Sequence, residues 1–124
     1  MKGIYKFEWD FSYGILSGIF IADSEDISLL ENNKIVLNFG EVLGKHSCVN
    51  EVNLDPGDFI KLTEDQDLVA AFENNNMFCG YNPFNIFISK YFMNIPKELL
   101  DKYPNEDWED MTAGEYINLL KTIK

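Results

Sequence analysis

The sequence predicts an α+β fold: one domain over residues 1–124, with an antiparallel sheet of about five strands, helices packed on one face and a helical C-terminal part. The order of the patterns carries this prediction, because alternating apolar residues dominate the first half and helical spacing dominates the second. The composition agrees. The chain has 124 residues, of which 46% are hydrophobic and 15% aromatic, so it is long enough and apolar enough to bury a core.

Two strands open the chain. Residues 5–11, YKFEWDF, alternate aromatic and charged side chains, which predicts a half-buried strand with an aromatic inner face. Residues 15–22 are apolar on both faces, as expected of a covered central strand. Gly18 lies in the middle of this run and indicates a bulge or a close approach of another backbone segment.

A hairpin is predicted over residues 34–54, with its tip near Gly44. The sequence DPGD at residues 55–58 is typical of a turn, and a short strand is expected at residues 59–62.

The helices are predicted from capping signals and apolar spacing. We expect helices at residues 24–32, 64–74, 83–93, 96–103 and 113–123. Capping boxes are predicted at TEDQ (residues 63–66) and at TAGE (residues 112–115). The stripe at residues 83–93 is rich in aromatic and β-branched side chains, so a strand remains possible there.

The charge of the chain excludes several functions. The net charge is −11, from 21 acidic residues and 10 basic ones, and all ten bases are lysines. Arginine fingers, bidentate phosphate clamps and arginine-based reading of bases are therefore excluded. The charge also argues against direct binding of nucleic acid and fits a basic protein partner.

The sequence favours a cytoplasmic protein. It contains no apolar run long enough for a membrane span, and its first residues lack the apolar stretch of a secretory signal. In that compartment we expect Cys48 and Cys79 to be free thiols.

The predicted hairpin tip, residues 38–50, holds the one candidate for catalysis. His46 and Cys48 have the spacing of a possible base and nucleophile, with Glu41 or Glu51 as a possible orienting carboxylate. One such pair is weak evidence, and we expect no enzyme activity. One histidine and two separated cysteines do not form a usual metal site, so we expect no metal and no cofactor.

The turn Gly44-Lys45-His46-Ser47 is not a nucleotide-binding loop, because Phe39 occupies the position of the upstream glycine. The turn could still hold one small anion. The apolar loop near Met77 could line a pocket or contact a partner, although core packing is the commoner outcome. An alternative function is therefore the binding of a small anionic ligand, through Glu41, Gly44, Lys45, His46, Ser47, Met77, Phe78 and Tyr81.

An acidic cluster surrounds the second tryptophan. Glu106, Asp107, Glu109 and Asp110 flank Trp108. The cluster could be a docking patch for a basic protein surface, with Trp108 as the buried anchor. It could also be a solvated linker with Trp108 in the core of the protein itself. The spacing does not match a calcium loop.

The segment FGEVLGKHS (residues 39–47), the aromatic first strand, the glycine-containing second strand and GYNP (residues 80–83) resemble a group of small bacterial and phage-type proteins, over roughly residues 3–92. The group has no established activity, so the resemblance implies no catalytic residue. It implies a phage-like origin, and small acidic proteins of that kind often resemble inhibitors of host systems. We therefore expect a non-catalytic acidic binding protein, an inhibitor that docks on a basic, nucleic-acid-binding protein surface.

Overall fold

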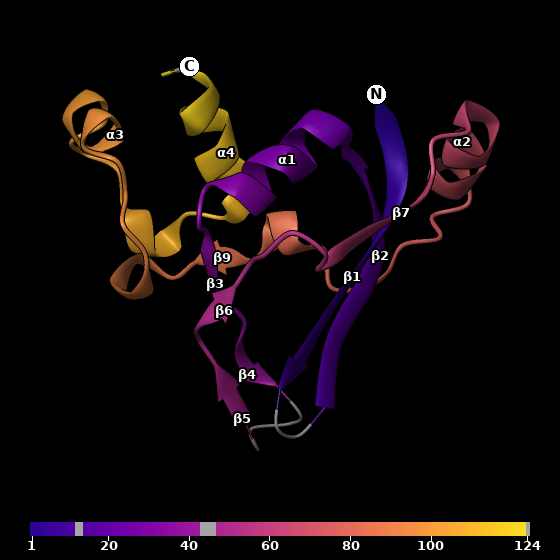
Figure 1. The fold of residues 1–124 in the computed structure, drawn as a ribbon, viewed down its shortest axis with the longest axis horizontal. Helices are drawn as coiled ribbons and strands as arrows, with labels where there is room; N and C mark the ends of the chain where they lie inside the picture. Colours follow the sequence, from indigo (N-terminus) through magenta and orange to yellow (C-terminus); the bar gives the residue numbers. More distant parts are fainter. Residues whose placement is uncertain (12–13, 43–46, 124) are drawn as a thin grey trace. The chain divides into compact units, whose positions relative to one another are not determined.

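The computed structural model describes residues 1–11, 14–42 and 47–123, and of Val42 and Ser47 it describes the backbone only. The fold is α+β, as predicted (Figure 1). The elements follow in the order β1 (Lys2–Phe11), β2 (Gly14–Asp23), α1 (Ser24–Asn32), β3 (Val36–Asn38), β4 (Gly40–Val42), β5 (Ser47–Val49), β6 (Val52–Asn53), β7 (Phe59–Thr63), α2 (Gln66–Asn74), β8 (Cys79–Gly80), η1 (Pro83–Asn85), β9 (Phe87–Ile88), η2 (Lys90–Phe92), α3 (Lys97–Lys102), η3 (Trp108–Asp110) and α4 (Ala113–Lys121).

The chain divides into two compact units, each built from two segments of the sequence. Unit 1 comprises Met1–Asn32 and Asp55–Asn82, and unit 2 comprises Asn33–Leu54 and Pro83–Lys124. The expectation of a single domain stays a prediction. No helix in the described part of the chain is both long enough and apolar enough to cross a membrane.

Unit 1 is a four-stranded antiparallel sheet in the order β7-β1-β2-β8. The predicted aromatic face of β1 is confirmed at Tyr5 and Phe7, which are buried. The Phe7 ring lies 5.4 Å from that of Phe59 on β7, and the Tyr5 ring stacks on Phe20 of β2 at 6.5 Å. These rings fill the core on one face of the sheet.

Strand β2 is a central strand of the sheet, as predicted. It is not fully covered on both faces, because Ile15 is 58% exposed. Gly18 is the site of a close backbone approach, also as predicted. A Cβ atom at Gly18 would lie 1.8 Å from the carbonyl oxygen of Tyr81, so only glycine lets β8 pair with β2 here.

Helices α1 and α2 lie on different sides of the unit 1 sheet, and not on one face as predicted (Figure 1). Helix α1 has the predicted bounds, whereas α2 begins at Gln66, later than predicted. The predicted capping box at residues 63–66 is wrong. Strand β7 continues through Thr63, and the Asp65 carboxylate caps α2 by accepting the backbone N–H groups of Asp67 and Leu68.

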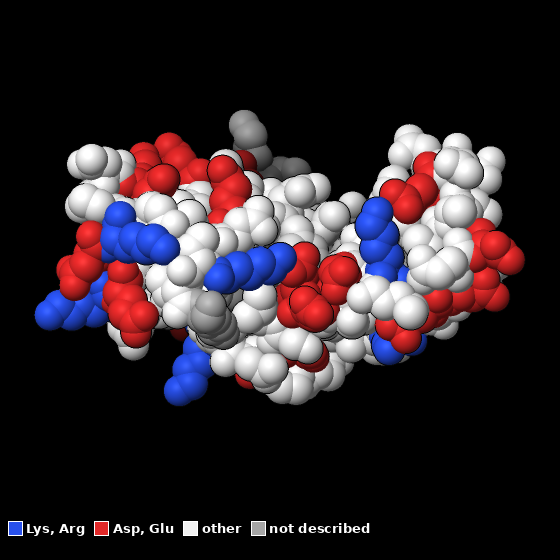
Figure 2. Space-filling view, turned by 90° about the horizontal axis from the view of Figure 1, so that it is seen from above, with Lys and Arg blue, Asp and Glu red and all other residues white. Residues whose placement is uncertain are grey.

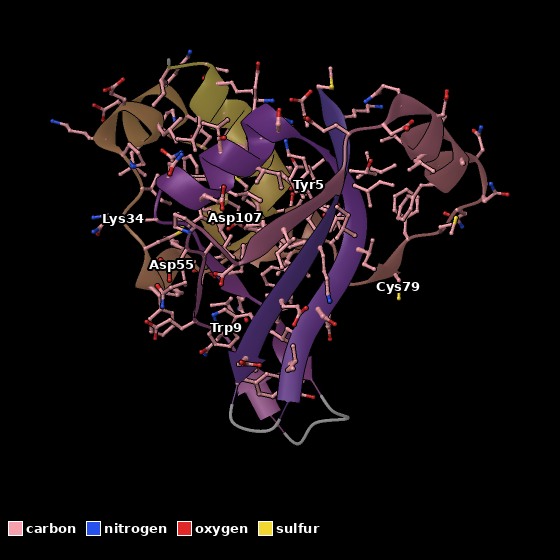
Figure 3. All side chains as sticks on the ribbon, turned by 45° about the vertical axis from the view of Figure 1, so that its right-hand side comes forward. Tyr5, Trp9, Lys34, Asp55, Cys79 and Asp107 are labelled. Atoms are coloured by element: carbon pink, nitrogen blue, oxygen red, sulfur yellow. The ribbon has the colours of Figure 1, made fainter. Side chains whose placement is uncertain are left out.

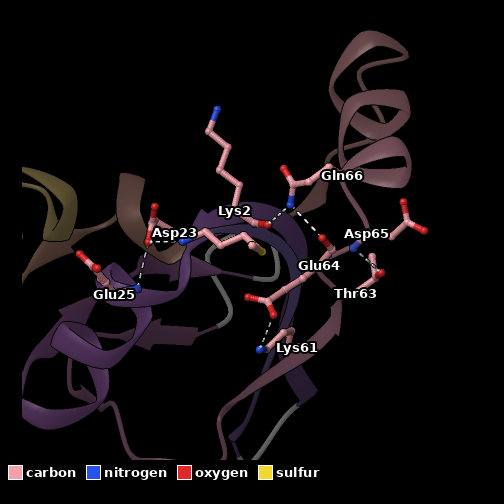
Figure 4. A network of polar contacts seen from close by, with 9 residues as sticks. Lys2, Asp23, Glu25, Lys61, Thr63, Glu64, Asp65 and Gln66 are labelled. Atoms are coloured by element: carbon pink, nitrogen blue, oxygen red, sulfur yellow. Dashed lines mark hydrogen bonds and ion pairs between the residues drawn. The ribbon is translucent and has the colours of Figure 1, made fainter.

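Polar contacts fix the start of α2 against the sheet (Figure 4). The side-chain amide of Gln66 donates to the carbonyl oxygens of Lys2, at 3.0 Å, and Glu64, at 2.8 Å.

The predicted turn at residues 55–58 is confirmed, because the backbone N–H of Asp58 donates to the carbonyl of Asp55 at 3.1 Å. Burial raises the pKa of Asp58.

Unit 2 contains a three-stranded sheet in the order β6-β3-β9 and the separate β4–β5 ladder. The predicted hairpin is confirmed in these two antiparallel ladders, β3–β6 and β4–β5. The chain has nine strands in its described part rather than about five. The excess arises because the hairpin is divided in two near Gly40, which has a positive φ of 67°, and because β8 and β9 are single short pairings.

The predicted helix at residues 83–93 is wrong. Two short 3-10 turns, η1 and η2, flank strand β9 in this segment. The backbone N–H of Ile88 donates to Met111, and that of Ser89 donates to Val36 at 2.7 Å. These pairings with distant segments satisfy the backbone and override the helical spacing, which β-branched and aromatic side chains support poorly.

The C-terminal helices are confirmed. Helix α3 falls inside the predicted residues 96–103, and α4 ends shortly before the predicted limit. The predicted capping box on α4 is present, with Thr112 and Glu115 each accepting from the backbone N–H of the other. Buried side chains of this unit include Ile35, Leu37, Val52, Ile88, Leu99, Trp108, Tyr116, Ile117 and Leu120.

Candidate functional site

The hairpin tip holds the candidate catalytic pair and the candidate anion site. Glu41 lies directly opposite Cys48 in the β4–β5 ladder, and both are exposed. Gly44, Lys45 and His46 lie outside the described residues. The proposed roles of the Cys48–His46 pair and of the Gly44–Ser47 turn therefore stay predictions.

The second part of the candidate ligand site is in unit 1. Met77, Phe78 and Tyr81 are exposed by 58%, 49% and 36%, so the expectation that this loop packs in the core is corrected. The Phe78 ring meets the buried Phe72 ring edge to face, with ring centres 5.1 Å apart, and about half of the Phe78 side chain stays exposed. Cys79, beside it on β8, is also exposed, and its sulfur points away from the ribbon in Figure 3.

Trp108 belongs to the core of unit 2. Its side chain is only 6% exposed, and its ring meets that of Tyr116 edge to face, with centres 6.3 Å apart. Burial raises the pKa of Tyr116 to about 12. The interpretation of Trp108 as an anchor for a partner is therefore corrected, and the alternative, with Trp108 in the core, describes the structure.

The four carboxylates around Trp108 are all exposed: Glu106, Asp107, Glu109 and Asp110. They are not a loose linker, because η3 fixes their backbone. The Asp107 carboxylate accepts the N–H of Glu109 at 3.1 Å, and the N–H of Asp110 donates to the carbonyl of Asp107 at 3.3 Å. A shallow hollow lined by Lys102, Tyr103, Pro104, Asn105 and Glu106 adjoins them.

Tyr91 is an exposed aromatic residue that contacts this carboxylate cluster. Its side chain is 76% exposed, and its hydroxyl donates a hydrogen bond to the Glu109 carboxylate. That hydrogen bond raises the pKa of Tyr91. The Lys90 ammonium lies 5.7 Å from the centre of the Tyr91 ring. We call the group formed by Glu106, Asp107, Glu109, Asp110 and Tyr91 the η3 surface.

Sequence reasoning missed Tyr91 because the apolar spacing of residues 83–93 placed it on the inner stripe of a helix. The signal that could have found it is the high content of aromatic and β-branched side chains, which had left a strand possible.

Residues able to bind a metal are not gathered in the described part of the chain, where no three His, Cys, Asp or Glu side chains form a suitable group. Comparisons with protein families, with curated proteins and with solved structures gave no match. The resemblance to small phage-type proteins thus stays a prediction.

Proposed function

We propose that this protein is a non-catalytic binding protein that docks on a basic protein surface through the η3 surface. One observation supports the proposal above the others. Four exposed carboxylates lie on or directly before one short turn, η3, and Tyr91, which is 76% exposed, is hydrogen-bonded to one of them, Glu109.

The η3 surface combines the two features that protein recognition uses. Carboxylates speed the encounter with a basic partner and select against acidic ones. A tyrosine supplies a large contact area at a small cost in side-chain entropy, and tyrosine is among the residues that dominate binding energy at interfaces. Because the Trp108 side chain, at the start of η3, is buried, the backbone of η3 has little conformational freedom to lose on binding.

We further propose that the partner surface is one that binds nucleic acid, and that the protein acts there as an inhibitor in the cytoplasm. Surfaces of that kind cluster lysine and arginine to neutralise phosphates, so a row of carboxylates can replace the nucleic acid. The net charge of −11, the lack of arginine and the phage-like resemblance support this choice.

The test begins with capture of partners from cell lysate on the immobilised protein, followed by purification of the captured protein and direct measurement of the Kd. We expect the Kd to rise at least tenfold between about 50 and 200 mM salt, since screening weakens exposed charge pairs. Nucleic acid added in excess should displace the protein from its partner.

Two variants locate the contact. Neutralising the η3 surface (Glu106→Gln, Asp107→Asn, Glu109→Gln, Asp110→Asn) should weaken binding at least tenfold, and Tyr91→Ala should do so by about 1–2 kcal/mol. The matched control neutralises four other exposed acids of unit 2, Glu41, Glu51, Glu98 and Asp101, with the same change in net charge. Equal weakening by the control would show that total charge, and not the η3 surface, determines binding.

A further inference from the structure

A second surface, on unit 1, combines exposed apolar side chains with acidic ones. Leu68 on α2 is 54% exposed, and Met77 and Phe78, which follow α2 in the chain, are 58% and 49% exposed. Leu68 and Phe72 are one helical turn apart and so share a face of α2, and the Phe72 ring contacts the Phe78 ring. Phe72 thus connects the face of Leu68 to Phe78, and we treat these exposed side chains, with Met77, as one apolar patch, a feature that marks interaction sites.

This patch is held on a rigid support. Phe72 forms a buried cluster with Val69 and Ile4, and the half-buried Ile19 and Ile21 of β2 pack against that cluster. The backbone N–H of Met77 donates to Phe72 at 3.1 Å, and that of Tyr81 donates to Ser17 at 3.0 Å. The segment after α2 thus presents its apolar side chains from a fixed backbone, which lowers the entropy cost of binding.

The surroundings of the patch are acidic. Glu64, Asp65, Asp67 and Glu73 lie on or directly before α2, and no lysine lies in its last turn. Figure 2 shows carboxylates gathered over the right-hand part of the view, where α2 lies.

Unit 1 as a whole has twelve acidic residues and three lysines. Each of these lysines is already within 4 Å of a carboxylate of the same unit, in the pairs Lys2–Glu73, Lys6–Glu8 and Lys61–Glu64.

We propose that Leu68, Met77, Phe78 and the acidic residues around them, here called the α2 surface, bind a basic amphipathic segment of another protein. Apolar side chains of that segment would cover Leu68, Met77 and Phe78, and its lysines or arginines would meet the carboxylates. A second copy of this chain fits poorly, because two units with such an excess of acid would repel each other. The proposal does not depend on the η3 surface, which is in unit 2.

The probe is a synthetic helical peptide of about 18 residues, with leucines at i, i+3, i+4 and i+7 and lysines elsewhere. One control peptide has glutamate in place of lysine, and another has serine in place of leucine. Titration of the full chain, followed by calorimetry and by backbone amide NMR shifts, measures the Kd and locates the contact. We expect the largest shifts in α2 and at residues 77–81, and at least tenfold weaker binding of both control peptides.

Matched variants separate the α2 surface from general stickiness. Met77→Ser should weaken peptide binding about tenfold, whereas Ile15→Ser should not, although both side chains are 58% exposed in the same unit. Asp67→Asn should weaken it about threefold, whereas Asp10→Asn, also exposed, should leave the Kd unchanged. Neutralising the η3 surface should have no effect, so this proposal and the proposed function can fail separately.

Four results would overturn the proposal. Equal binding of the glutamate peptide would show that apolar contact alone is sufficient. Equal binding of the serine peptide would show that charge alone is sufficient. Equal weakening by Ile15→Ser would place the contact elsewhere. Concentration-dependent dimerisation of the chain that Met77→Ser abolishes, measured by analytical ultracentrifugation, would identify the occupant as a second copy.

Discussion

Gly18 and Gly80 face each other on neighbouring strands, where neither position has room for a side chain. A Cβ atom at Gly80 would lie 2.3 Å from the carbonyl oxygen of Ser17, and Gly80 also has a positive φ of 70°. These two glycines let β8 reach the sheet at all, and thereby fix the segment that presents Met77 and Phe78.

We expect Gly18→Ala to lower the free energy of unfolding by about 3 kcal/mol, because the new methyl group must displace the Tyr81 backbone. Gly14→Ala, on the same strand, is the control. Its Cβ would meet only ordinary contacts, the nearest 3.6 Å away on the Phe11 ring, so a change within about 0.5 kcal/mol is expected. Chemical denaturation measures both variants, and equal losses would contradict the packing argument.

At the scale of the element, capping chemistry decides where α4 starts. The Glu115 carboxylate accepts hydrogen bonds from the backbone N–H of Thr112, at 3.0 Å, and from its hydroxyl, at 3.1 Å. The backbone hydrogen bond is the larger cause, and both lower the pKa of Glu115 below its ordinary value. Ionised Glu115 therefore stabilises the folded state.

This lowered pKa predicts a pH dependence. Because the folded-state pKa is lower than the unfolded one, the stabilisation is fully present above the ordinary glutamate pKa of about 4.5, and it is lost as the pH falls through the folded-state value. Glu115→Gln has no such charge to lose. The difference in unfolding free energy between the two proteins should be constant near neutral pH and should shrink in acid. A difference that grows in acid would contradict the capping box.

Across the whole molecule, the two units differ in their charge. Unit 1 has twelve acidic residues and three lysines, whereas unit 2 has nine and seven. A division of the sequence into residues 1–54 and 55–124 does not show this contrast, because each unit takes residues from both parts. The excess of acid is a property of unit 1, which the order of residues does not show.

Self-repulsion in unit 1 predicts that salt stabilises it more than unit 2. The screening length falls from about 30 Å at 0.01 M salt to about 10 Å at 0.1 M, which weakens repulsion between exposed carboxylates. Each unit contains one tryptophan, so Trp9 fluorescence in a Trp108→Phe variant reports unit 1, and Trp108 fluorescence in a Trp9→Phe variant reports unit 2. Urea unfolding in sodium chloride gives both responses. An equal or smaller gain in unit 1 would contradict the prediction.

Local chemistry in the sequence determined much of this fold. The alternation of residues 5–11, the turn at residues 55–58, the bounds of α1 and the capping box of α4 depend on neighbours a few positions apart, so the sequence was sufficient for each. The exposure of the four carboxylates around Trp108 was also among the predicted alternatives, because burial of unpaired charge is costly.

Only the tertiary structure decided the rest, because it depends on pairings between distant segments. Residues 83–93 are not a helix, since Ile88 pairs with Leu37 on β3. This strand pairing leaves Tyr91 exposed beside Glu109, whereas Trp108 packs against Tyr116. Helical spacing shows which side chains can share a face, but the partner that buries a face is supplied by residues far away in the sequence.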